Sequence, residues 1–183
     1  MYFTPRMIQM VADQYGYPPL RNMVAPVDRE EFDFIKSTQY FGRSHDVTMY
    51  IFKGNQVIVN AKHHYPKGLF RAPSGGLKPG ETFEEGVYRE AYEETGTEIG
   101  LDRYILQLNV NFVCGKHYIP WRTHVMTAHY ISGVLKPIDT QEIREVKLAD
   151  LSEFDDFKQI IVYLNSGGLK YRARLHDEVV KLL

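Results

Sequence analysis

The chain is poor in cysteine, in net charge and in long apolar runs. Its 183 residues include one cysteine, Cys114, so an internal disulfide is excluded and a reducing cytoplasm is the expected location. The formal net charge of −1 does not favour bulk nucleic acid as the main partner. Because no apolar run reaches about 18 residues and no basic start precedes an apolar N-terminal core, we expect neither a membrane span nor a signal peptide.

Hydrophobic residues are abundant by contrast. They make up 44% of the chain, which is enough for one well-buried core and fits one domain with extensions. Cys114 itself lies in an apolar run, a setting more typical of a packed core thiol than of a nucleophile.

Glutamate is concentrated in one stretch, Gly75–Thr97, which begins as a Gly/Pro turn. Thr82 followed by Glu85 predicts a helix that starts with a capping box, and Gly96 predicts a left-handed residue at its end. The six glutamates of the stretch are Glu81, Glu84, Glu85, Glu90, Glu93 and Glu94.

Three of these carboxylates, on Glu90, Glu93 and Glu94, fall on one side of the predicted helix. They repel one another unless a cation lies between them, and oxygen-rich sites suit hard cations such as Mg²⁺ or Mn²⁺. The pattern therefore indicates either a site for phosphate chemistry or a solvated acidic helix face.

The order of residues in this stretch resembles the signature of the Nudix family, G-x5-E-x7-R-E-U-x-E-E-x-G-U, in which U is a bulky aliphatic residue. All glycine and charged positions match, while Ala91 and Thr97 replace the two aliphatic residues. The preceding run Gly68–Gly75 is similar to the family's lead-in, with Phe70 in place of the usual Trp and Ser74 in place of a Gly.

The resemblance implies Mg²⁺- or Mn²⁺-dependent hydrolysis of a nucleoside diphosphate linked to another group, X. It implies that Glu90 and Glu94 are the principal metal ligands and that Glu93 is a further ligand or a base. The carbonyl of Gly75 would complete the metal shell.

Arg89 and the general base complete the implied catalytic set. Arg89 is expected to pair with a glutamate such as Glu81, and direct contact with a phosphate is the alternative. Family members recruit the base from different places, and Glu142 and Glu145 lie in the appropriate later region, with Glu142 as our candidate.

The substrate is less well determined by the sequence. Lys62, Arg71 and Lys78 are candidates for phosphate contacts, and Trp121 is a candidate for stacking on a base; solvated charges and plain packing are the alternatives. The Pro typical of many ADP-ribose hydrolases and the run typical of NADH hydrolases are both missing. We nevertheless expect a small nucleoside diphosphate derivative, such as a nucleotide sugar or an ADP-ribose-like compound.

Two other functions remain open at this point. A nucleoside triphosphate pyrophosphohydrolase would use the same carboxylates. A non-catalytic nucleotide sensor would be free to lose them, and their presence favours the enzyme.

Outside the motif, the pattern predicts an α/β fold, with a mixed β-sheet sandwiched between helices as in other Nudix proteins (α/β/α). We expect an N-terminal helical extension in residues 1–45, which could serve as a dimerisation arm, a lid or packing at the sheet edge. Residues 46–183 would form the Nudix hydrolase domain with C-terminal helices. A homodimer is a further expectation, and Gly115–Pro120 is expected to be a loop between two strands.

Overall fold

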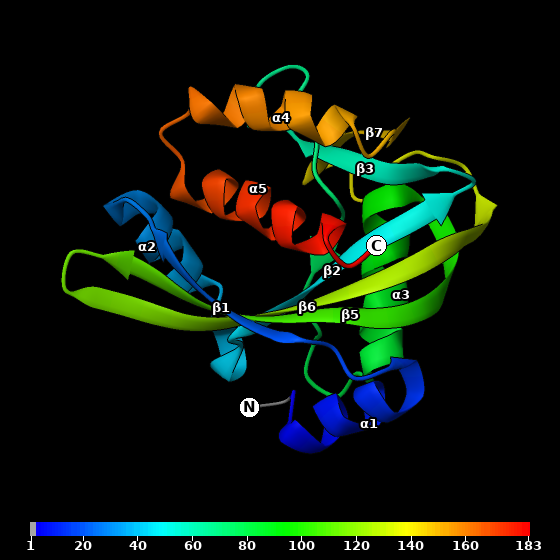
Figure 1. Ribbon diagram of the computed structural model, residues 1–183, viewed down its shortest axis with the longest axis horizontal. Coiled ribbons are helices and arrows are strands. Elements are labelled where there is room, and N and C mark those ends of the chain that lie inside the picture. Colours follow the sequence, from blue (N-terminus) through cyan, green and yellow to red (C-terminus); the bar gives the residue numbers. More distant parts are fainter. Residues whose placement is uncertain (1–2) are drawn as a thin grey trace.

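The computed structural model describes residues 3–183 and contains one mixed sheet (Figure 1). Strands β1 and β5, and strands β2 and β6, pair in parallel, whereas the other neighbours are antiparallel. The predicted mixed sheet is therefore confirmed. In spatial order the strands are β1 (Leu20–Pro26), β5 (Thr97–Cys114), β6 (His117–Gly133), β2 (His45–Lys53), β3 (Gln56–Lys62) and β7 (Ile143–Ala149), and the short β4 (Ser74–Gly75) pairs with β2.

Helices cover both faces of this sheet. Along β2, Met49 and Ile51 point to one core, while Tyr50 between them points to the other, because successive strand residues face opposite sides. The predicted α/β/α arrangement is confirmed. One core holds α1 (Pro5–Tyr15) and α3 (Phe83–Thr95), and the other holds α2 (Arg29–Ser37), α4 (Glu153–Val162) and α5 (Gly167–Val180).

The N-terminal segment contains two helices, α1 and α2, each with a capped start. Thr4 Oγ1 accepts a hydrogen bond from Met7 N at 3.2 Å, and Asp28 Oδ1 accepts one from Glu31 N at 2.8 Å. Between the helices lies strand β1, which the sequence analysis did not predict. Its seven residues bury few side chains, so its alternation is weak, and its stability depends on long-range pairing with β5.

The helix of the glutamate-rich stretch, α3, has the predicted ends. Thr82 and Glu85 exchange both bonds of the capping box, at 2.8 and 3.2 Å, and Gly96 ends the helix at a φ of 69°. The apolar line Phe83, Val87 and Ala91 is buried against the sheet, so the polar face of α3 turns toward the loops that follow β3 and β4.

The prediction of a loop at Gly115–Pro120 is wrong. Strands β5 and β6 form one long hairpin whose turn is Gly115–Lys116, and β6 already begins at His117. Pro120 pairs with Asn111 of β5, and β2 first meets β6 at Arg122. Because β6 has no strand on its other side at Pro120, a residue without an N–H is tolerated there.

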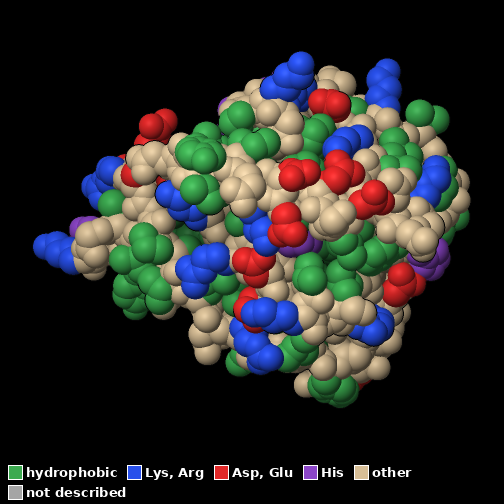
Figure 2. All heavy atoms as spheres, turned by 45° about the horizontal axis from the view of Figure 1, so that its top comes forward, with side chains coloured by type: hydrophobic (Ala, Val, Ile, Leu, Met, Phe, Trp, Pro, Cys, Tyr) green, Lys and Arg blue, Asp and Glu red, His purple; other side chains and the backbone are tan. Residues whose placement is uncertain are grey.

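The surface carries charges of both signs, in agreement with the small net charge. Acidic, basic and hydrophobic side chains are interspersed on the face that Figure 2 shows. Within residues 3–183, no helix combines the length and the apolar character that a membrane crossing requires.

Candidate active site

One guanidinium, that of Arg89, organises the carboxylates of α3. Its Nε and Nη2 donate to Glu81 at 2.6 and 2.9 Å, which confirms the predicted pairing. Its Nη1 donates to Glu90 at 2.8 Å and to Glu93 at 3.0 Å, and Nη2 also donates to the carbonyl of Gly76 at 3.0 Å. We call Arg89, Glu81, Glu90 and Glu93 the Arg89 cluster. It places three carboxylates around one cation and fixes the glycine turn to the helix.

Glu90 lies directly against the glycine turn. A Cβ at Gly75 would overlap the Glu90 carboxyl group, so only glycine leaves this space for it. Burial raises the pKa of Glu90, and the nearby charges of Glu94 and Glu93 add to this, although Arg89 opposes it. The carboxylate of Glu90 is thus incompletely neutralised by the protein.

Glu94 belongs to a second, more deeply buried set of contacts. Its Oε1 accepts from Arg71 Nη2 at 3.2 Å, and its Oε2 accepts from Asn60 Nδ2 at 2.7 Å and from the backbone N–H of Ser74 at 2.8 Å. A carboxylate offers about four lone-pair sites, so one site on Oε1 remains for another partner.

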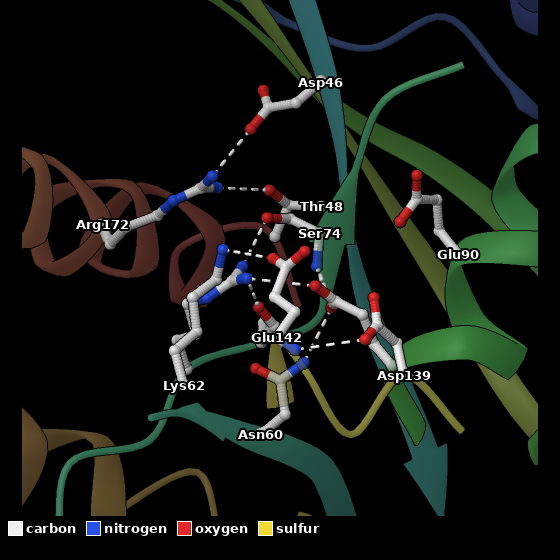
Figure 3. A network of polar contacts seen from close by, with 12 residues as sticks. Asp46, Thr48, Asn60, Lys62, Ser74, Glu90, Asp139, Glu142 and Arg172 are labelled. Atoms are coloured by element: carbon white, nitrogen blue, oxygen red, sulfur yellow. Dashed lines mark hydrogen bonds and ion pairs between the residues drawn. The ribbon is translucent and has the colours of Figure 1, made fainter. Parts of the chain in front are cut away.

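A later loop reaches the end of α3. The N–H groups of Ile138 and Asp139 donate to the carbonyl of Glu93 at 3.0 and 2.9 Å, and Asp139 Oδ1 accepts from Glu142 N at 3.1 Å. The Glu142 carboxylate accepts a hydrogen bond from Lys62 and is roughly half exposed. Figure 3 draws this pair near Asn60 and Ser74, with the Glu90 side chain projecting from α3. The structure therefore brings Lys62 and Glu142 to the edge of the site.

Trp121 lies in a different environment, which we call the Asp46 cluster: Asp46, Arg172, Thr123, Trp121 and Thr48. Asp46 Oδ1 accepts from Trp121 Nε1 at 3.0 Å and from Thr123 at 2.6 Å, and Arg172 donates to Asp46 Oδ2 and to Thr48 at 2.8 and 2.9 Å. Burial opposes ionisation of Asp46, yet Arg172 and the two other donors hold its pKa below the usual value. Only 8% of Trp121 is exposed, so stacking on a base would require this ring to become accessible.

The predicted metal ligands lie near one another, but their side chains are not arranged as a metal-coordination site. Among residues 3–183, no group of three or more His, Cys, Asp or Glu side chains is closely enough arranged to hold a metal ion. Glu93 instead bonds Arg89 and lies 3.7 Å from Lys78 Nζ. Each of the predicted ligands Glu90, Glu93 and Glu94 is therefore paired with an Arg or Lys side chain.

Comparison with known proteins identifies the family of the chain. A model of the NUDIX domain matches residues 30–164, which is more than half of the chain. The chain belongs to the Nudix family. All the glutamates discussed above lie within the matched range, as does Arg89.

Individual Nudix relatives are more distant. An NAD-capped RNA hydrolase NudC from Chromobacterium violaceum is 36% identical over 52 residues, covering 28% of this chain and 20% of the relative. An NAD-capped RNA hydrolase from Schizosaccharomyces pombe is 42% identical over 43 residues, covering 24% and 11%. The chain thus spans about a fifth or less of the length of these curated relatives.

Solved Nudix structures resemble the fold at low identity. A UDP-X diphosphatase is 15% identical with a TM-score of 0.49, covering 80% of this chain and 66% of that one. An ADP-ribose pyrophosphatase from Streptococcus suis is 18% identical with a TM-score of 0.49, covering 75% and 91%.

Three polar residues of the Nudix site were not found from the sequence. Asn60 and Ser74 bond Glu94, and Asp139 shapes the loop that carries Glu142. A lone Asn in a strand and a Ser in a glycine turn carry no motif. Their role follows from the pairing of Asn60 with Arg71 across the sheet edge.

Proposed function

We propose that the protein is a metal-dependent pyrophosphohydrolase that cleaves a nucleoside diphosphate linked to another group, X. The observation that carries the proposal is the contact of the Glu90 carboxyl group with Gly75, beside two further carboxylates. This arrangement concentrates negative charge beside the glycine turn.

The oxygen donors beside the glycine turn are of the kind that Mg²⁺ or Mn²⁺ prefers, and the Glu93 side chain would have to move to complete the site. The carbonyl of Gly75, the carboxylate of Glu90 and the remaining lone pair of Glu94 Oε1 would hold the cation, and Glu93 would join them by exchanging its bond with Arg89. When bound, the cation would neutralise the diphosphate and raise the acidity of water at the site.

The chain's own side chains would orient the substrate and move the proton. Arg89 holds Glu90 in place and the glycine turn against α3, which makes it a positioning residue. Glu142 is the proposed base, because its loop is bonded to the end of α3 and its carboxylate is partly exposed. Lys62, which bonds Glu142, would also approach a phosphate.

Two other cations have different expected roles. Lys78 is largely exposed and lies near Glu93, so it is the simpler candidate for a phosphate contact. Arg71 is buried against Glu94 and Ser74. We therefore propose that it orients Glu94 and does not contact the phosphate directly. A stacking role for Trp121 stays a prediction, as do the homodimer and the division of the chain near residue 45.

A substrate panel tests the proposal. It contains ADP-ribose, UDP-sugars, nucleoside triphosphates and, because the curated relatives are named NAD-capped RNA hydrolases, NAD and an NAD-capped oligonucleotide. We expect Mg²⁺-dependent release of monophosphate products from a diphosphate conjugate, faster than turnover of any triphosphate.

Three results would contradict the proposal in different ways. Full activity in excess EDTA would exclude the metal-dependent chemistry. Faster turnover of triphosphates would replace the proposed substrate class by the alternative one. Nucleotide binding without turnover of any compound would indicate a sensor on the Nudix fold.

A further inference from the structure

A second charged group lies on the glycine turn, on the residue next to Gly75. The guanidinium of Arg43, in the segment between the 3₁₀ turn η1 (Tyr40–Gly42) and β2, packs on Gly76, where a Cβ would overlap it. Arg43 Nε donates to the carbonyl of His45 at 3.1 Å, and the guanidinium carbon lies 5.5 Å from the centre of the Trp121 ring. Neither the family signature nor the sequence analysis pointed to this residue.

Arg43 differs from the other two guanidiniums that contact the Gly75–Thr97 stretch. Arg89 bonds three glutamates and Arg71 bonds Glu94. Within residues 3–183, Arg43 has no carboxylate within 4.0 Å, and its two terminal nitrogens donate no hydrogen bond. A half-buried guanidinium with five donors and one bond retains most of its capacity for an anion.

The glycine turn therefore separates two opposite charges. The Glu90 carboxylate overlaps the space that a Gly75 side chain would take, and the Arg43 guanidinium overlaps the space of a Gly76 side chain. An anion lying over the turn would have the carboxylates and their cation on one side and the Arg43 guanidinium on the other.

We propose that Arg43 is a substrate-binding residue that donates to the phosphate oxygens of the diphosphate. The proposal rests on the proposed function and identifies the group that would bind the part of the diphosphate turned away from Glu90. Planar guanidinium groups bind phosphate through two parallel hydrogen bonds, and Arg43 has its terminal nitrogens available for them.

A purely structural role is the alternative, in which Arg43 does no more than pack on Trp121 and Gly76. The two roles differ in what Arg43→Gln changes. Loss of a phosphate contact weakens anion binding and leaves the melting temperature nearly unchanged, whereas loss of packing lowers the melting temperature and leaves anion binding unchanged.

The test measures binding of inorganic pyrophosphate with Mg²⁺ by calorimetry, together with KM, kcat and the melting temperature. Arg43→Gln should weaken pyrophosphate binding about tenfold or more and raise KM by a similar factor, and Arg43→Lys should restore part of both. Gly76→Ala should also weaken pyrophosphate binding, because the added Cβ displaces the flexible end of the Arg43 side chain while its charge is retained. The matched control is Arg29→Gln on α2, an exposed arginine paired with Asp33 that should change neither quantity.

The outcomes separate this inference from the proposed function. If the wild type binds pyrophosphate but hydrolyses no conjugate, and Arg43→Gln abolishes that binding, only the proposed hydrolase function is contradicted. Unchanged pyrophosphate binding in Arg43→Gln, or no binding by the wild type, would overturn the role of Arg43 even if hydrolysis is observed.

Discussion

The Arg89 cluster and the Asp46 cluster are both built from carboxylates and a guanidinium, but they differ in how many carboxylates share that guanidinium. In the Arg89 cluster, one guanidinium meets three carboxylates whose side chains are 19 to 37% exposed. In the Asp46 cluster, one carboxylate that is 5% exposed meets one guanidinium, an indole N–H and a hydroxyl. The second cluster is electrically complete, and such buried pairs act mainly on folding.

The first cluster is complete only with further positive charge. Burial raises the pKa of Glu90, and the charges of Glu94 and Glu93 raise it further, so this carboxylate is costly to keep ionised in the site. The comparison therefore assigns the Arg89 cluster to ligand binding and the Asp46 cluster to stability. The predictions below try to break this assignment.

The largest expected effect is on activity, from Glu90→Gln. Gln keeps the shape and can still accept from Arg89, but it removes the charge that would hold a cation, so kcat/KM should fall by about two orders of magnitude or more. The melting temperature should stay the same or rise, because a carboxylate that folding disfavours has been neutralised. A Glu90→Gln enzyme with wild-type kcat/KM would refute the assignment.

Asp46→Asn should show the opposite behaviour. It leaves the positive charge of Arg172 without the carboxylate that balances it in a buried site, so the free energy of unfolding should fall by about 3 kcal/mol. Urea unfolding measures this, with Asp33→Asn at an exposed position of α2 as the control, for which about 0.5 kcal/mol or less is expected. A loss for Asp46→Asn no larger than the control's would show that the cluster contributes little to folding.

A smaller effect concerns pH, because the core also contains uncharged histidines. Burial lowers the pKa of His45 and of His176 to about 4 and that of His124 to about 3. Below about pH 6.5 the unfolded chain binds protons that the folded chain does not, so stability is lost as the pH falls from 6.5 toward 4.

Urea unfolding of wild type and of His124→Gln at pH 6.5 and pH 5 tests this expectation. Each such histidine contributes up to about 1.4 kcal/mol per pH unit, so the wild type should lose about 2 kcal/mol more than the variant over this interval. His117→Gln, at an exposed position of the β5–β6 hairpin, should behave as wild type. Equal losses in wild type and His124→Gln would show that His124 is not held neutral.

Local patterns made much of α3 and its charges predictable. The capping box and the glycine cap depend on residues close together in the chain, so their spacing indicates them, whereas the Arg89–Glu81 pair was expected from the resemblance to the Nudix signature. Strands β2 and β3 likewise contain short apolar runs, which are local patterns of the sequence.

Contacts set by distant pairing were not predictable. Asn60 meets Glu94 from 34 positions away, and Arg43 meets Gly76 only because β2 and β4 are neighbours in the sheet. Strand β1 was missed for a similar reason, since its weak alternation is stabilised by β5, more than 80 positions further along the chain.

Binding of Mn²⁺ in the absence of substrate tests the central claim most directly. Titration of wild type, Glu90→Gln and Glu98→Gln, followed by electron paramagnetic resonance of free Mn²⁺, compares the cluster with an exposed glutamate of β5. We predict that wild type and Glu98→Gln bind Mn²⁺ alike and that Glu90→Gln binds it at least tenfold more weakly. Equal binding by wild type and Glu90→Gln would contradict the claim that the Arg89 cluster is completed by a cation.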